Sequence, residues 1–134
     1  MLSEQTTDAL IEALHDEYKA RATYRAVIDA YGDVRPFINI VEAEGRHVGA
    51  LLTLFDEYSI AVPQDDWAEK VTLPSSLGAA CEVAVQAEIV NAAMYERLLD
   101  GIEEPDIRNV FRNLQSASRD RHLPAFRRCA ARYQ

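Results

Sequence analysis

The sequence lacks the features that mark several common classes of protein. Its two cysteines, Cys81 and Cys129, are too few for a disulfide scaffold and do not have the spacing of a zinc ribbon. It has no glycine-rich phosphate loop, no low-complexity tract and no strand pattern. No apolar run approaches the length of a membrane span, and no basic-then-apolar leader opens the chain. We therefore expect a cytoplasmic protein without a membrane segment.

Positive charge is also scarce in this chain. The formal net charge is -8, from 14 Lys and Arg against 22 Asp and Glu. This balance argues against nucleic acid or an anionic membrane as a partner. The 134 residues, 49% of them hydrophobic, are enough for one domain with a real core. We expect a single domain over residues 1–134, which could form a homodimer.

Apolar residues recur at helical spacing in four segments, which predicts an all-α protein. Thr6 or Thr7 can cap the first helix, and Gly32 can close it. Pro124 lies inside the fourth helix and should kink it, because it removes one hydrogen bond and crowds the carbonyl of Asp120. The predicted helices cover residues 6–31, 36–58 and 75–101, and a last segment that begins at residue 105.

The connection over residues 59–74 is unusually long for a compact domain. Fully extended it could reach roughly 50 Å, whereas a helix of the second segment's length spans roughly 35 Å. It could therefore return along the bundle as a crossover and make the second and third helices parallel, with Trp67 as its anchor. The pairs of helices on either side of this crossover should each be antiparallel, because short turns join their members.

Polar residues interrupt the apolar face of each predicted helix. Glu44 and His47 are three residues apart, so they lie side by side on the face that should point into the core. A buried carboxylate needs a partner, and a metal ion can be one. Glu-x-x-His pairs that point into a helical bundle supply ligands in di-iron carboxylate proteins. The inward positions of the other helices add Glu17, Glu88 and His122.

Register places these five residues in one layer. Glu17 and His47 are equally far from the turn between their helices, as are Glu88 and His122, so each pair should face one another. Carboxylate oxygens together with imidazole nitrogens suit iron, manganese or zinc. The alternative is an all-protein polar network, in which the histidines are ordinary core residues and the carboxylates pair with arginines.

Four stretches of the sequence carry a resemblance that covers nearly the whole chain. They are residues 16–20, 36–47, 87–91 and 117–126. The sequence resembles the ferritin-like superfamily, which includes rubrerythrins, bacterioferritins and ferritins, and most nearly a family of short bacterial ferritin-like proteins. The resemblance implies a ferritin-like four-helix bundle whose site is rubrerythrin-like. Its functional implication is broader, since this superfamily includes iron storage, peroxide reduction and oxygenation.

One position departs from the symmetrical pattern of that superfamily. Arg119 stands three residues before His122, where a second bridging Glu would stand. Glu44 is then the single candidate bridging carboxylate, so we expect two iron ions, or one ion and a weaker site. Arg119 could fold towards Glu88 and compete with a cation, or it could extend along the helix surface into water.

Two tyrosines repeat across the halves of the chain. Tyr24 follows Glu17 by seven residues, and Tyr95 follows Glu88 by the same interval. They could donate hydrogen bonds or electrons to a metal site. The leading hypothesis is therefore a di-iron carboxylate oxidoreductase, ferroxidase-like or peroxidase-like, that reacts with dioxygen or peroxide. The alternatives are a metal-binding protein without turnover and a structural or interaction protein with a decayed site.

The same register arithmetic places the two cysteines opposite one another. Cys81 and Cys129 are each seven residues further from their turn than Glu88 and His122, which is two helical turns or roughly 10 Å. We expect Cα atoms within disulfide reach. The pair could be two small buried hydrophobic residues, or a redox-active pair or disulfide.

Overall fold

The computed structural model describes all residues, 1–134, and contains helices but no strands. The all-α prediction is confirmed. Two short segments differ from the α-helices: η1 is a 3-10 helix, and η2 is a π-helix between two α-helices. The elements are α1 (Glu4–Tyr31), α2 (Phe37–Glu57), η1 (Trp67–Glu69), α3 (Leu77–Leu99), α4 (Pro105–Ala117), η2 (Ser118–His122) and α5 (Leu123–Arg132).

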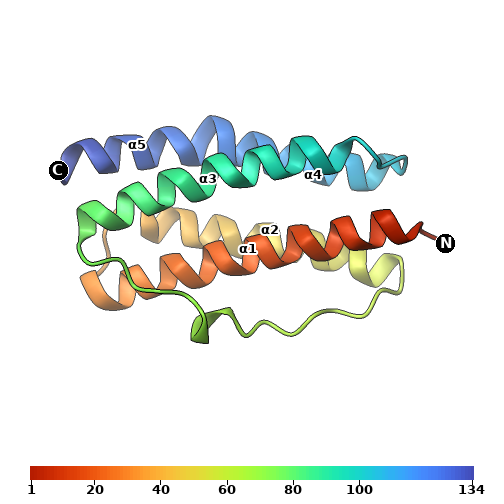
Figure 1. Cartoon of the computed structure of the whole chain (residues 1–134), viewed down its shortest axis with the longest axis horizontal. Coiled ribbons are helices and arrows are strands. Elements are labelled where there is room, and N and C mark those ends of the chain that lie inside the picture. The colour runs from red at the N-terminus through yellow and green to blue at the C-terminus, as the bar shows by residue number, and fades with distance from the viewer.

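Four long rods lie side by side, because α4, η2 and α5 follow one another as a single rod (Figure 1). Helices α1 and α2 run in opposite directions, and so do α3 and the α4–α5 rod (Figure 1). The segment between α2 and α3 returns along the length of the molecule, so these two helices run in the same direction (Figure 1). Helix α1 packs against both α2 and α3.

The returning segment is fastened to α1 at several points. Arg21 of α1 forms an ion pair with Asp65 at 3.1 Å. The Trp67 indole N–H donates to Nδ1 of His15 at 3.1 Å, so Trp67 anchors the segment as expected. Nearer the start of α3, the Tyr31 hydroxyl donates to a backbone carbonyl of the segment.

Two helices, α1 and α3, begin at a serine whose side chain caps them, and the cap of α1 corrects the prediction. Ser3, rather than Thr6 or Thr7, caps α1: its hydroxyl accepts from the backbone N–H of Thr6, and Thr6 itself is buried. Helix α1 therefore begins two residues earlier than predicted. At its other end Gly32 has a φ of 90°, a conformation that favours glycine. Ser76 caps α3: its hydroxyl accepts from the backbone N–H of Ala79.

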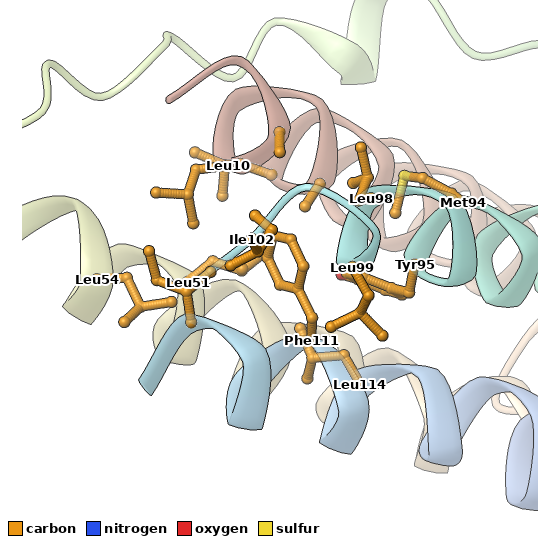
Figure 2. Packing of buried hydrophobic residues seen from close by; sticks show 14 of the residues in the cluster. Leu10, Leu51, Leu54, Met94, Tyr95, Leu98, Leu99, Ile102, Phe111 and Leu114 are labelled. Carbon is orange, nitrogen blue, oxygen red and sulfur yellow. The ribbon is translucent and has the colours of Figure 1, made fainter. Parts of the chain in front are cut away.

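The core consists of two apolar clusters with a polar layer between them. One cluster lies towards the N-terminal end of α1 and includes Leu10, Leu51 and Phe111 (Figure 2). The other lies towards the C-terminal end of α1 and includes Phe37 and Phe126. Buried carboxylates and histidines occupy the layer between the two clusters. The fold thus encloses charged groups at mid-length rather than at an exposed end.

Helix α3 is long and apolar enough to cross a membrane by length and composition alone. This corrects the expectation that no segment approaches a membrane span. The same test is passed by core helices of soluble proteins. Glu88 and Asn91 lie on the buried face of α3 and make hydrogen bonds to another helix, so one face of α3 packs against the other helices in this fold.

Candidate metal centre

The structure brings all five predicted residues together in two groups that share one carboxylate. Every donor atom within a group lies within 4.8 Å of the others. All five side chains are buried. The first group is Glu17, Glu44 and His47, and the second is Glu44, Glu88 and His122.

In the first group the three facing atoms have no hydrogen-bond partner. They are Oε1 of Glu17, Oε2 of Glu44 and Nδ1 of His47. The histidine nitrogen lies 3.7 Å from each of the two carboxylate oxygens, which is too far for a hydrogen bond. A buried polar atom without a partner is costly, so the concentration of three such atoms at one point needs an explanation.

The second group is more compact. Nδ1 of His122 lies 3.1 Å from Oε1 of Glu88 and 3.2 Å from Oε1 of Glu44. Glu44 therefore directs one oxygen to each group, in the position expected for a bridging carboxylate. The rings of His47 and His122 are stacked with centroids 5.4 Å apart, so the two groups are neighbours in one layer.

Each outer carboxylate is held by a tyrosine from another helix. The Tyr24 hydroxyl donates to Oε2 of Glu88 at 2.5 Å, and the Tyr95 hydroxyl donates to Oε2 of Glu17. Both tyrosines are fully buried. Each bond fixes one oxygen of its carboxylate and leaves the other oxygen facing the histidines. The two tyrosines thus orient the candidate ligands by direct contact.

Burial and close charges shift the protonation of the layer. Burial raises the pKa of Glu17 to about 7, and repulsion from Glu44 adds to this. Burial opposes charge on His47 and His122, but the adjoining carboxylates outweigh it and raise their pKa values to about 10 and about 9. Burial disfavours charge on Glu44 as well, yet its contacts with Glu17 and both histidines lower its pKa overall. Without a metal, the imidazoles therefore carry protons that balance the carboxylates.

Sequence reasoning did not assign a site role to Asn91, although it stands three residues after Glu88 as His47 does after Glu44. Its amide nitrogen lies 2.7 Å from Oδ2 of Asp16 and 3.4 Å from Oε2 of Glu17. Its amide oxygen accepts from the Ser118 hydroxyl at 2.5 Å. Asn91 is a polar residue at an inward position of its helix, and this position could have identified it as part of the site.

Arg119 does not take part in the layer. Its side chain is 56% exposed and pairs with Asp120 at 2.9 Å. Of the two orientations expected for Arg119, the structure shows the one that extends along the helix surface, and not the one that folds towards Glu88. The π-helical turn around it widens the helix and takes the arginine out of the inward face.

Cys81 and Cys129 form a disulfide that joins α3 to α5, with Cα atoms 5.6 Å apart. The predicted facing of the two residues is confirmed. Both are completely buried. The bond links the helix that carries Glu88 to the helix that follows His122, and so it restrains the two elements of the second group.

The donor set fits a transition metal. Ligands that share one metal at about 2.1 Å lie roughly 3–4 Å apart, and the distances from each histidine nitrogen to the carboxylate oxygens of its group fall in this range. Oxygen and imidazole donors of this mixture are those of iron, manganese and zinc sites. A cation bound between the three unpartnered atoms of the first group would give each of them a partner.

The fold and this layer define an all-helical protein with a buried cluster of carboxylates and imidazoles. The chain belongs to the family described as "Uncharacterized protein domain (DUF2202)", whose model matches residues 6–132. It is 27% identical to the "Uncharacterized protein MJ0754" of Methanocaldococcus jannaschii, over 98% of this chain and 78% of that protein. The crystal structure of hypothetical protein MJ0754 superposes with a TM-score of 0.88 at 26% identity, covering 98% of this chain and 83% of that one.

Proposed function

We propose that this protein binds two iron ions and serves as a di-iron carboxylate redox protein that reacts with dioxygen or peroxide. The observation that carries the proposal is the group of three buried, unpartnered donor atoms on Glu17, Glu44 and His47. An all-protein network would be expected to pair these atoms, because unpaired buried polar groups are destabilising. Bound iron would supply one-electron chemistry towards dioxygen or peroxide.

Each residue of the layer has a distinct task in this proposal. Glu17 and His47 would hold one ion, Glu88 and His122 the other, and Glu44 would contribute one oxygen to each. Binding requires the histidines to release the protons that they carry in the metal-free protein. The surrounding apolar clusters exclude water from the layer.

The arrangement of the helices supports the same proposal. Ferritin-like bundles join two antiparallel helix pairs by a long crossover, and their metal ligands project inward from all four helices. The rods in Figure 1 have this order and direction. We infer a ferritin-like topology on this ground. A cytoplasmic location is less favoured than the sequence indicated, since disulfides such as Cys81–Cys129 are uncommon in that compartment.

The direct test is metal reconstitution followed by exposure to air. Metal-free protein is loaded with Fe(II) without oxygen, its metal content is measured by elemental analysis, and oxidation is followed by absorbance. We expect about two equivalents of iron and faster oxidation than in buffer. Glu44→Gln keeps the size of the shared ligand and removes its charge, whereas Glu42→Gln changes an exposed carboxylate two residues away on the same helix.

The outcomes separate the candidate functions. Loss of metal in Glu44→Gln together with retention in Glu42→Gln supports the proposed centre. Stable binding of iron without accelerated oxidation would indicate a metal-binding protein without turnover. Failure of the unmodified, folded protein to retain any transition metal would refute the proposal and favour a polar network with a structural role.

A further inference from the structure

A cleft between α1 and α3 approaches the metal layer from outside. It has a volume of about 730 Å³ and is lined by residues of both helices and by Trp67 of the returning segment. A smaller cleft of about 250 Å³ lies further along the same two helices. Asp16 and Lys19 line both clefts. Asp16 is half-buried, so its carboxylate lies where the surface opens towards the interior.

A chain of direct contacts leads inward from Asp16. Oδ2 of Asp16 accepts from the Asn91 amide nitrogen at 2.7 Å, and the same nitrogen lies 3.4 Å from Oε2 of Glu17. The other oxygen of Glu17 is one of the three unpartnered donor atoms. Asn91 is buried, so one neutral side chain stands between a carboxylate at the cleft and a carboxylate of the site.

Three other clefts have no lining residue that bonds a candidate ligand. The cleft between α3 and α4 carries three arginines against two acidic residues, so its charge does not favour a cation. The cleft between α1 and α2 includes Glu42, but none of its lining residues bonds a candidate ligand. In the α1–α3 cleft Glu12 offsets the charge of Arg97, and the Lys19 amine lies over the Trp67 ring.

We propose that Asp16 and Asn91 form the route by which a divalent cation enters the buried centre. The negative charge of Asp16 attracts the hydrated cation into the cleft. The Asn91 side chain then rotates, and the cation moves on to bind Glu17. A primary amide suits this position because it carries no charge that would hold or repel the cation, and its oxygen can ligate in passing. This inference rests on the proposed metal centre and concerns the rate of loading rather than the final occupancy.

The test measures how fast metal-free protein takes up Co(II), a redox-stable probe, by stopped-flow absorbance. Asp16→Asn removes the charge and keeps an oxygen that can accept from Asn91, so we expect loading to slow by about 10-fold, in the range of electrostatic steering. The final stoichiometry should not change. Glu42→Gln, which removes a carboxylate at the opposite cleft, should load within about twofold of the unmodified rate.

Two further measurements keep the inference falsifiable. Asn91→Ala removes the intervening side chain and should load faster than the unmodified protein, and circular dichroism verifies that both variants are folded. Rising salt should slow the unmodified protein more than Asp16→Asn, because it screens the charge on Asp16.

The failures of the two proposals are distinguishable. Normal stoichiometry with an unchanged loading rate in Asp16→Asn overturns the route and leaves the metal centre intact. Slower loading in Glu42→Gln but not in Asp16→Asn places the route at the other cleft and also overturns it. Absence of Co(II) binding in the unmodified protein overturns the metal centre and, with it, the route.

Discussion

The two buried tyrosines are expected to differ in their contribution to stability. Tyr24→Phe removes the one hydrogen bond to Oε2 of Glu88. Tyr95→Phe removes the corresponding bond to Oε2 of Glu17, but that oxygen still has the Asn91 amide at 3.4 Å. A hydrogen bond to a charged group contributes about 1.5–3 kcal/mol. We therefore expect Tyr24→Phe to cost the metal-free protein about 2–3 kcal/mol, and Tyr95→Phe about 1–2 kcal/mol.

Urea denaturation of the metal-free protein, followed by circular dichroism, measures this difference. The slope of the unfolding free energy against urea should stay constant, which shows that each variant unfolds as the unmodified protein does. Tyr31→Phe is the matched control: its hydroxyl donates to a neutral carbonyl at 2.5 Å, so about 0.5–1.5 kcal/mol is expected. If Tyr95→Phe lowers the unfolding free energy as much as Tyr24→Phe or more, the Asn91 amide does not compensate for the lost hydroxyl, and the reasoning is refuted.

Three further results are expected. His47→Ala should weaken metal binding on the order of 10-fold or more by calorimetric titration while the helices remain, and unchanged affinity would make His47 a core residue only. The metal-free protein should lose thermal stability as pH rises from about 5 to 10, because the pKa of Glu17 is raised from 4.5 to about 7 and that of His47 from 6.5 to about 10. In this pH range Glu17 and His47 bind more protons in the folded protein than in the unfolded chain. A melting temperature that rises with pH over that range would contradict this prediction. Reduction of the Cys81–Cys129 bond, which closes a separation of 48 residues, should lower the unfolding free energy by about 2–4 kcal/mol, as urea titration with and without reductant would show.

The sequence was sufficient to place the helices and the members of the polar layer. Helical spacing identifies the inward positions, and a charged residue such as Glu17 or Glu88 on an apolar face is conspicuous. Contacts that depend on side-chain rotamers or on the exact residue at which a helix begins could not be predicted from residue spacing. Ser3 lies outside the apolar pattern, which points instead to Thr6 or Thr7 as the cap. The contact of Asp16 with Asn91 joins two helices and depends on rotamers that spacing does not specify.

The π-helical segment explains the largest difference between the expected and observed sites. In the last rod the buried residues Leu114, Ser118, His122 and Phe126 follow one another at four-residue steps. In a regular α-helix each such step overshoots one turn by about 40°, so three steps would move the stripe by roughly a third of a turn. The π-helix at Ser118–His122 absorbs this drift and keeps His122 on the face of Glu88.

Pro124 is coupled to the same segment. Its ring would crowd the carbonyl of Asp120, and it offers no N–H for the usual bond to that carbonyl. A wider turn just before the proline accommodates both conditions, so the π-helix relieves the crowding that Pro124 would cause in a regular α-helix. The extra width also directs Arg119 outward to Asp120. Arg119→Glu should therefore leave metal stoichiometry unchanged, since a carboxylate at this exposed position cannot reach the layer; a gain of bound metal in that variant would show that the π-helix does not persist in solution.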